Sequence, residues 1–311
     1  MKRKNLFTLL ILIYVSVCVI GCSDDKAVSG IGLYDISNDD KQILFTWCHN
    51  GGASILQIDT NGVLLKSIIP ATIDTNYFNP KYDRGGTRVL FIGSPKNNPF
   101  NCSIYIANVD GTEKKNIVYE QGLIGEAVFS ECEDKIYYIK SKEFGHSSPV
   151  GRSQPHESDI YSVNLKDGKI ERITNMNAYS LYRISEYDCN SMIMDLPPSD
   201  GMVKFFKNDP SHLINITPLN NPRQDSTLYD SPIYSRRYNI LAFLAPYELY
   251  IMNMDRKQAQ SVARDENMIS NIRLFNNQKR IVYTNEVDND FFFINFDGSG
   301  SKRVSVPIKT D

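Results

Sequence analysis

The sequence lacks the charge pattern of a nucleic-acid-binding protein. Its 311 residues carry a formal net charge of −2, and loss of Lys2, Arg3 and Lys4 with a leader would change that charge to −5. Basic residues beyond the N-terminus gather only in short groups such as Lys114-Lys115. Because phosphate binding needs a basic patch, we expect no nucleic-acid partner.

The sequence also lacks the closely spaced cysteine pairs of a zinc site. Of its six cysteines, Cys18 and Cys22 belong to the N-terminal segment, and the others are Cys48, Cys102, Cys132 and Cys189. In an exported protein these four could form two disulfides by any of three pairings. Scattered core thiols are the alternative, and the spacing does not decide between them. With only four histidines in the chain, we expect no metal site and no cofactor.

No apolar run is long enough for a typical membrane-spanning helix. The stretch from Leu6 to Ile20 has about 15 residues, whereas a spanning helix needs about 20. It follows a basic start and ends in Val19-Ile20-Gly21-Cys22, which is typical of a secretory signal peptide. A transmembrane anchor is the alternative, and the short stretch and the small residue before Cys22 disfavour it.

The ending at Cys22 resembles the lipobox of bacterial lipoproteins. That resemblance implies a signal peptide over residues 1–21, acylation of Cys22, and contact with a membrane through the lipid. The following Ser23-Asp24-Asp25 resembles the short tract that directs Bacteroidetes lipoproteins to the cell surface; a plain linker is the alternative. We therefore expect an outer-membrane lipoprotein of the cell envelope, with a tether over residues 22–30.

Beyond Cys22 no 12-residue stretch has helical periodicity, and one β-rich unit recurs instead. Each unit pairs a β-rich run with an alternating strand that leads into an Asn or Asp-Gly turn. The clearest copies are Val89–Ile92 with Ser103–Gly111, Ile136–Ile139 with Asp159–Gly168, Ile240–Leu244 with Glu248–Asp255, and Ile281–Thr284 with Phe292–Gly298. Two worn copies are Ile43–Trp47 with Ser54–Gly62, and Met192–Met194 with Val203–Phe206.

Six such units predict an all-β fold, a six-bladed β-propeller with four antiparallel strands in each blade. A β-sandwich is the alternative, but sandwiches do not repeat one signature six times. The unit resembles the TolB-type, WD40-like propeller repeat of bacterial envelope proteins, although the usual proline is missing from every turn between the first and second strands. We expect one propeller over residues 31–306 and a tail over 307–311.

The variable loops indicate where a ligand would bind. In a propeller the second-to-third-strand (B–C) loops and the links between blades (D–A) share one end, and here those of blades 2 to 4 are long. The B–C loop of blade 3 is expected to run from Ser141 to Ser158. We predict binding at that end through His49, His146, Arg152, His156 and Arg223. A metal or general-base cluster is one interpretation of these histidines, and a polar surface loop is the other.

No catalytic motif accompanies the repeat, and no catalytic residue is assigned. Gly145-His146-Ser147-Ser148-Pro149 lacks the last glycine of a nucleophile elbow. We therefore expect a monomeric, non-enzymatic envelope lipoprotein that binds a protein or glycan partner. The alternative is a polysaccharide lyase of the oligogalacturonate type, because such lyases are also propellers and use a histidine-bound metal at the channel mouth.

Overall fold

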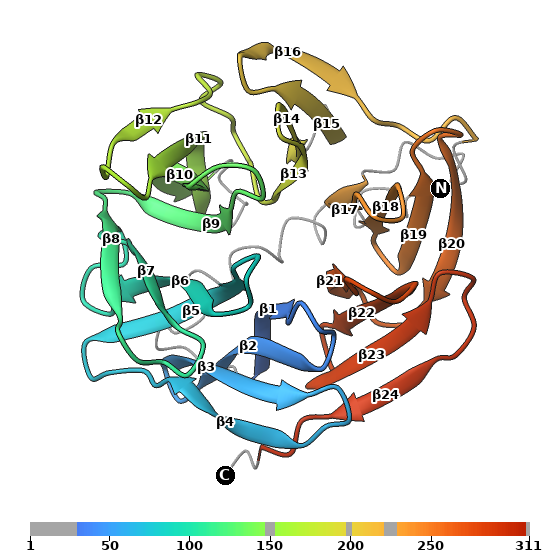
Figure 1. Cartoon of the computed structure of the whole chain (residues 1–311), viewed down its shortest axis with the longest axis horizontal. Helices are drawn as coiled ribbons and strands as arrows, with labels where there is room; N and C mark the ends of the chain where they lie inside the picture. The colour runs from blue at the N-terminus through green and yellow to red at the C-terminus, as the bar shows by residue number, and fades with distance from the viewer. Residues whose placement is uncertain (1–29, 147–152, 197–200, 221–228, 309–311) are drawn as a thin grey trace, which may run out of the picture.

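A computed structural model describes residues 30–146, 153–196, 201–220 and 229–308 of the chain. It contains 24 β-strands in six four-stranded antiparallel sheets that are arranged as blades around a central channel (Figure 1). The predicted six-bladed β-propeller is therefore confirmed. Within these four ranges no helix is present that is long and apolar enough to cross a bilayer.

Each blade is formed from four consecutive strands, so no strand is exchanged between blades. The first three blades are β1 (Gly30–Ile36), β2 (Gln42–His49), β3 (Gly52–Asp59) and β4 (Leu64–Ile69); β5 (Thr75–Tyr82), β6 (Arg88–Pro95), β7 (Ser103–Asn108) and β8 (Lys115–Tyr119); and β9 (Leu123–Phe129), β10 (Lys135–His146), β11 (Ser153–Asn164) and β12 (Ile170–Arg172). The last three are β13 (Ile184–Asp188), β14 (Ser191–Leu196), β15 (Gly201–Phe206) and β16 (Asp209–Asn215); β17 (Asp230–Ser235), β18 (Ile240–Ala245), β19 (Glu248–Asn253) and β20 (Gln258–Arg264); and β21 (Ile269–Leu274), β22 (Arg280–Asn285), β23 (Asp290–Asn295) and β24 (Lys302–Ser305).

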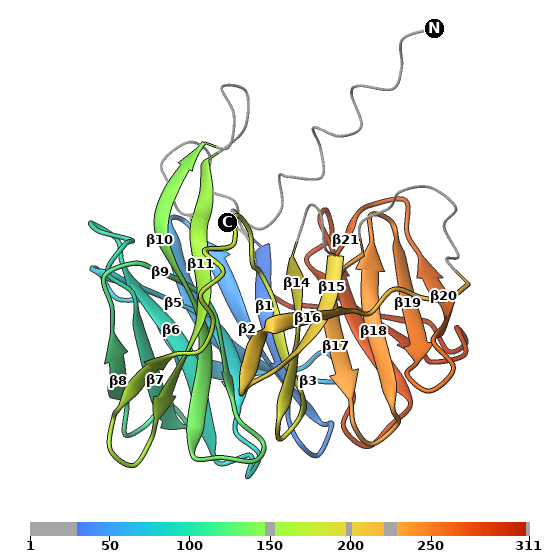
Figure 2. The same cartoon turned by 90° about the horizontal axis from the view of Figure 1, so that it is seen from above.

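The first strand of each blade lines the channel. These innermost strands are β1, β5, β9, β13, β17 and β21, and each contacts the innermost strand of the next blade. Because the strands alternate in direction, the turns between first and second strands (A–B turns) all lie at one end of the channel. The B–C connections and the links between blades lie at the other end, where the β10–β11 hairpin projects from the body (Figure 2).

Apolar side chains on both faces of each sheet hold the blades together. In β6, Leu90 and Ile92 pack toward blade 3, whereas Val89 and Phe91 pack toward blade 1. All four are fully buried, and burying each such side chain contributes roughly 1.5–3 kcal/mol. This packing on two faces explains why the second strands are continuous apolar runs rather than alternating ones.

The Asp-Gly turns of the repeat have a steric cause. Gly111 ends the turn between β7 and β8 with a φ of 89°, and a Cβ atom there would lie 2.3 Å from the carbonyl oxygen of Ile68. Only glycine fits this approach. The preceding Asp110 accepts the backbone N–H of Thr112 at 3.0 Å and so closes the same turn.

Side-chain contacts close the ring between blades 6 and 1. The Tyr34 hydroxyl lies 2.8 Å from the carbonyl oxygen of Asn271 and 3.1 Å from that of Val282. The Phe291 ring packs edge-on against Tyr34, with 5.1 Å between ring centroids. The joint therefore consists of packing and hydrogen bonds between two sheets that share no strand.

The B–C connection of blade 3 differs from expectation. We expected a loop from Ser141 to Ser158, but β10 and β11 stay paired until His146 meets Ser153. Edge contacts from neighbouring blades support this extension: Phe144 packs on Phe100 of blade 2, with ring centroids 6.1 Å apart. The polar composition of the segment hid the strands, because its sequence has little of the apolar alternation that marks them elsewhere.

Candidate functional site

A pocket of about 470 Å³ opens at the A–B end of the channel. Every blade contributes to its rim, through the turn or strand-end residues Asn38, Arg84, Glu131, Glu186, Arg236 and Asn276. Its floor is formed by charged residues on the innermost strands or directly before one of them, chiefly Asp35, Lys81, Glu126, Arg183 and Arg273. The pocket therefore joins an exposed ring of turns to a buried ionic cluster.

Four of the floor residues form a continuous network of ion pairs. The Lys81 Nζ atom lies 3.2 Å from Glu126 Oε1, and Arg273 Nη2 lies 3.6 Å from the same oxygen. Arg273 Nε lies 3.5 Å from Asp35 Oδ1. Lys81, Glu126 and Arg273 are all buried, with side-chain exposures of 8%, 2% and 9%. Ionic groups so far from solvent interact strongly with one another and with any charged ligand that enters.

Backbone groups fix the two carboxylates in place. The Asp35 carboxylate accepts the N–H of Tyr82 at 2.9 Å, and the Glu126 carboxylate accepts the N–H of Ile184 at 3.0 Å. Each of these bonds joins neighbouring blades, so the network also connects the innermost strands. The cluster is consequently preorganised by the fold and does not depend on mobile side chains.

Arg183 stands beside this network, in the segment just before β13. Its Nη2 donates to Asn271 Oδ1 at 2.9 Å, across the channel from blade 4 to blade 6. Its backbone N–H donates to Asp195 Oδ1 at 2.7 Å, and Asp195 also accepts the N–H of Ser231 at 3.2 Å. Arg183 is therefore held at both ends, with its guanidinium in the channel.

Burial changes the acidity of both carboxyl groups. Loss of hydration raises the pKa of Asp35 to about 6, although the positive charge of Arg273 opposes the shift. The same loss raises the pKa of Glu126 to about 7, opposed by the charge of Arg183. The pKa of the Arg273 guanidinium is lowered by its burial. The charge of the cluster therefore changes within the range of pH 5 to 8.

Links between successive A–B turns make the rim rigid. Asn38 Nδ2 donates to the carbonyl oxygen of Arg84, and Arg84 Nη1 donates to that of Glu131 at 3.0 Å. Arg237 Nη1 donates to Asn277 Oδ1 at 2.6 Å, and the backbone N–H of Asn277 donates to Asp40 at 2.7 Å. Between blades 4 and 5 the rings of Tyr187 and Tyr234 pack 4.4 Å apart.

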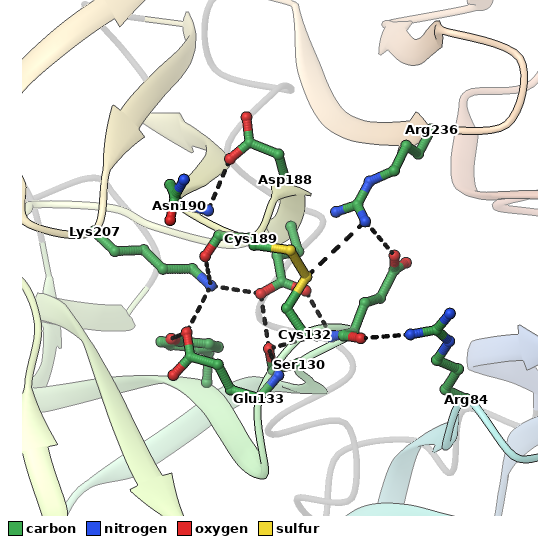
Figure 3. Close-up of a disulfide and its surroundings, with 12 residues drawn as sticks. Arg84, Ser130, Cys132, Glu133, Asp188, Cys189, Asn190, Lys207 and Arg236 are labelled. Carbon is green, nitrogen blue, oxygen red and sulfur yellow. Dashed lines mark hydrogen bonds and ion pairs between the residues drawn. A yellow bond between two sulfur atoms is a disulfide. The ribbon is translucent and has the colours of Figure 1, made fainter.

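A disulfide joins blades 3 and 4 in this rim. Cys132 and Cys189 come from successive A–B turns and are bonded to each other (Figure 3). The Lys207 ammonium lies beside them and contacts Glu186 Oε1 at 2.5 Å and Glu133 Oε1 at 3.5 Å. The structure therefore has one disulfide where the sequence allowed two, and Cys102 is a buried thiol, so each of the two expectations holds for part of the cysteines.

The described residues among those predicted for the opposite end belong to blades 1 and 3. His49 ends β2 in blade 1, where its Nε2 atom accepts Asn50 Nδ2 at 2.8 Å. His156 lies in β11 of blade 3, where its ring stacks on Tyr179 and its Nε2 lies 2.7 Å from the carbonyl oxygen of Gly145. His146 is the last residue of β10. Arg152, Arg223 and Cys22 lie outside the described residues.

No grouping of metal ligands appears in the part of the chain that the structure describes. Three or more His, Cys, Asp or Glu side chains that could hold one ion do not meet anywhere in these ranges. His49, His156 and His212 lie in β2, β11 and β16, which belong to three different blades. The interpretation of the histidines as a metal or general-base cluster therefore gains no geometric support.

Sequence reasoning missed the channel residues, although a signal was present. Asp35, Lys81 and Arg273 pair with Leu44, Leu90 and Val282, which hold the same place in the second strands of their blades. Each stands two residues before the A–B turn begins. Aligning the first strands of the repeats would have placed three charged residues at one inward-facing position.

Comparison with known proteins identifies the fold and no family. No protein-family model matches the sequence, and no curated protein matches it. Among solved structures, TolB from Acinetobacter baumannii is similar, with a TM-score of 0.65 and 13% identity over 86% of this chain and 66% of that one. This chain thus spans slightly less than two thirds of that TolB structure.

Two enzymes with propeller folds are also similar. An oligogalacturonate lyase in complex with manganese has a TM-score of 0.60 and 13% identity, over 88% of this chain and 76% of the lyase. A gluconolactonase from Xanthomonas campestris has a TM-score of 0.59 and 14% identity, over 83% of this chain and 84% of that enzyme. The fold is therefore TolB-like, and it is shared by proteins with different activities.

Proposed function

We propose that this protein is a non-enzymatic binding module of the cell envelope, which receives a protein or glycan partner at the A–B end of its propeller. The observation that carries the proposal is the pocket of about 470 Å³ with its charged floor and its rim from all six blades. Its volume falls in the range of ligand sites. The linked turns and the disulfide hold the rim in one shape, which lowers the entropic cost of binding.

The arrangement of the charged groups favours binding over catalysis. A nucleophile or general base needs a reactive group that is free to act on a substrate. In the channel, the Glu126 carboxylate is bonded to Lys81 and to the backbone of Ile184, and Asp35 to Arg273 and to the backbone of Tyr82. Such groups position a ligand more readily than they transfer its protons.

The disulfide between Cys132 and Cys189 supports an exported location, because disulfides persist mainly in oxidising compartments. The N-terminal sequence suggests that the exported body is a lipoprotein held through acylated Cys22. Residues 23–30 would then span at most about 30 Å, so the propeller would stay near the membrane. We propose that it acts there as a monomer.

Binding measurements test the proposal and locate the contact face. The purified mature chain is immobilised and screened against a glycan array and against envelope extract from the source cell. A rim variant, Arg84→Gln with Arg236→Gln, is compared with a variant of the opposite end, Arg152→Gln with His156→Gln and Arg223→Gln. We expect only the rim variant to lose the partner; loss confined to the second variant would place the contact at the B–C end.

The lyase alternative is tested separately. The protein is incubated with uronate oligomers and Mn²⁺, and the unsaturated product is followed by ultraviolet absorbance. We expect no product, because no group of three metal-ligating side chains meets within the described residues. Steady formation of that product by the wild-type protein would overturn the non-enzymatic proposal.

A further inference from the structure

One donor in the channel floor has no hydrogen-bond acceptor. The Nη2 atom of Arg273 is fully shielded from solvent, and no acceptor among the described residues satisfies hydrogen-bond geometry with it. Its contact with Glu126 at 3.6 Å is an ion pair and not a hydrogen bond. The other terminal nitrogen, Nη1, donates to the carbonyl oxygen of Ile272 at 2.8 Å. A buried, charged donor without an acceptor is destabilising, and most such donors in folded proteins have a partner.

The surrounding charges do not cancel. The pocket floor contains three cationic side chains, Lys81, Arg183 and Arg273, and two carboxylates, Asp35 and Glu126. With both carboxylates ionised, one positive charge remains in excess. Arg273 is one of the residues that line the pocket opening at the A–B rim, so a ligand in the pocket meets this side chain.

From these two observations we infer that the channel floor is a binding site for the carboxylate group of a small organic acid. The guanidinium of Arg273 turns toward the carboxylate, which then accepts the N–H of Nη2, and Lys81 of blade 2 and Arg183 of blade 4 add attraction. Arginine suits this role because its guanidinium forms directed, charge-assisted bonds to carboxylates. The inference adds a class of ligand to the proposed function. It rests on the proposed function in one respect, which is that a ligand enters the channel at the A–B end.

The charge of the floor selects a monoanion. Above pH 7, where Asp35 and Glu126 are both ionised, a single carboxylate neutralises the one excess positive charge, whereas a phosphate dianion would leave a negative charge buried beside them. A cation would meet three cationic side chains. An uncharged ligand would leave both the unpaired donor and the excess charge as they are.

Two sources of a carboxylate fit this chemistry, a sugar acid and the end of a peptide. Galacturonate and the dipeptide Ala-Ala acetylated at its N-terminus are therefore titrated into the mature protein by calorimetry. Galacturonate methyl ester and the C-terminal amide of the same dipeptide are the matched uncharged controls. We expect at least one acid to bind and its uncharged partner to bind at least tenfold more weakly.

Variants assign any binding to the channel floor. Arg183→Gln and Arg273→Lys are each expected to weaken the acid about tenfold or more, the loss typical of one charge-assisted hydrogen bond. Arg264→Gln is the control, because Arg264 lies on the outer strand β20 with 79% of its side chain exposed. Near-ultraviolet circular dichroism confirms that each variant is folded, and Arg183→Gln keeps the test valid if the change at Arg273 prevents folding.

The outcomes separate this inference from the proposed function. The carboxylate site would be overturned if the acids and their uncharged partners bound with equal affinity. It would also be overturned if neither acid bound at 10 mM while the rim variant still lost its macromolecular partner. Both results would leave the proposed binding module standing. Binding of phosphate more tightly than either acid would also overturn the carboxylate site. Acid binding that survives Arg183→Gln and Arg273→Lys would place the site elsewhere.

Discussion

The carboxylate of Asp40 accepts the backbone N–H of Asn276 at 2.7 Å, although 236 positions separate the two residues in the chain. The other oxygen of Asp40 accepts the N–H of Asn277, also at 2.7 Å. The first A–B turn thereby holds the last one. Asp40 is 2% exposed, so water competes little for these bonds.

The first prediction concerns this joint. In Asp40→Asn an amide nitrogen would face one of the two N–H groups, so one charge-assisted bond is lost and a donor is left unpaired. Asparagine tolerates the φ of 63° at this position, which keeps backbone strain out of the comparison. We expect the free energy of unfolding to fall by about 1.5–3 kcal/mol, measured by urea denaturation.

Asp110→Asn is the matched control. Asp110 is an exposed turn residue whose Oδ1 accepts only the N–H and hydroxyl of Thr112, and an amide oxygen can replace it. The denaturation midpoint of this variant is expected to equal that of the wild type. If Asp40→Asn also left the midpoint unchanged, the two hydrogen bonds of Asp40 would contribute nothing measurable to the joint between blades 1 and 6.

A second prediction concerns the disulfide between Cys132 and Cys189. It closes a loop of 57 residues, for which chain entropy predicts a stabilisation of about 4 kcal/mol. Residual order in the unfolded chain reduces that figure, so we expect Cys132→Ser to lower the free energy of unfolding by about 2–4 kcal/mol. The measurement is thermal or urea denaturation followed by circular dichroism.

The double variant Cys132→Ser with Cys189→Ser provides the control. Because either single change removes the whole bond, the double variant is expected to match the single one. A thiol reductant should lower the stability of the wild type by a similar amount and leave the double variant unchanged. If the reductant left the free energy of unfolding of the wild type unchanged, the disulfide would not stabilise the protein.

The third prediction concerns pH. Burial, and then the negative charge of Asp195, raise the pKa of Asp230 to about 7 from its ordinary value of 3.8. The folded protein therefore holds this proton more tightly than the unfolded chain does. The resulting stabilisation is fully present below pH 4 and is lost as the pH rises through 7. We expect the free energy of unfolding to fall between pH 5 and 8, and Asp230→Asn to remove about 2 kcal/mol of that fall.

Asp39→Asn is the control for this titration. A hydrogen bond from the Ser37 hydroxyl is the main cause that lowers the pKa of Asp39, so this carboxylate stays ionised from pH 5 to 8. Its replacement should leave the slope over that interval unchanged. An Asp230→Asn protein with the full wild-type slope would show that other groups take up the protons.

A fourth prediction concerns the projecting β10–β11 hairpin. The ring of Tyr179 packs against His156 with centroids 4.9 Å apart, and Phe100 supports Phe144 from the side of blade 2. In Tyr179→Ala we expect faster amide hydrogen exchange over Phe144–His146 and Ser153–His156, measured by mass spectrometry. The midpoint of global unfolding should hardly change, because the hairpin end lies beyond the body of the propeller.

Tyr179→Phe keeps the ring and removes only the hydroxyl, so its hairpin should exchange as slowly as that of the wild type. Equal exchange in all three proteins would mean that the β10–β11 ladder holds itself without help from blade 4.

The fold could be predicted because its determinants are local and repeated. Runs such as Val89–Ile92 recur in each blade, and turns such as Asp110-Gly111 recur in most of them, so several copies predict the same geometry. The pairing of Cys132 with Cys189 was within reach as well, since both lie in A–B turns of successive blades. The rule that neighbouring turns lie side by side in a propeller would have selected it.

The channel floor was harder to predict because its members differ in residue type. Asp35, Lys81 and Arg273 occupy one place in the repeat, yet their charges alternate in sign and carry no motif. Glu126 and Arg183 join them from other places in their blades. The relation that matters is a distance across the channel, which only closure of the ring creates. The B–C face, with Arg152, His156 and Arg223, remains a prediction.

The A–B turns that form the rim of the pocket lie at the opposite end of the propeller from the projecting β10–β11 hairpin (Figure 2). A molecule seated at one end therefore leaves the other end uncovered, and two partners need not compete. Once the first is bound, the second meets it at a raised effective concentration, without any change in the shape of the propeller. Two partners bound in this way would be held at a separation that the rigid propeller sets.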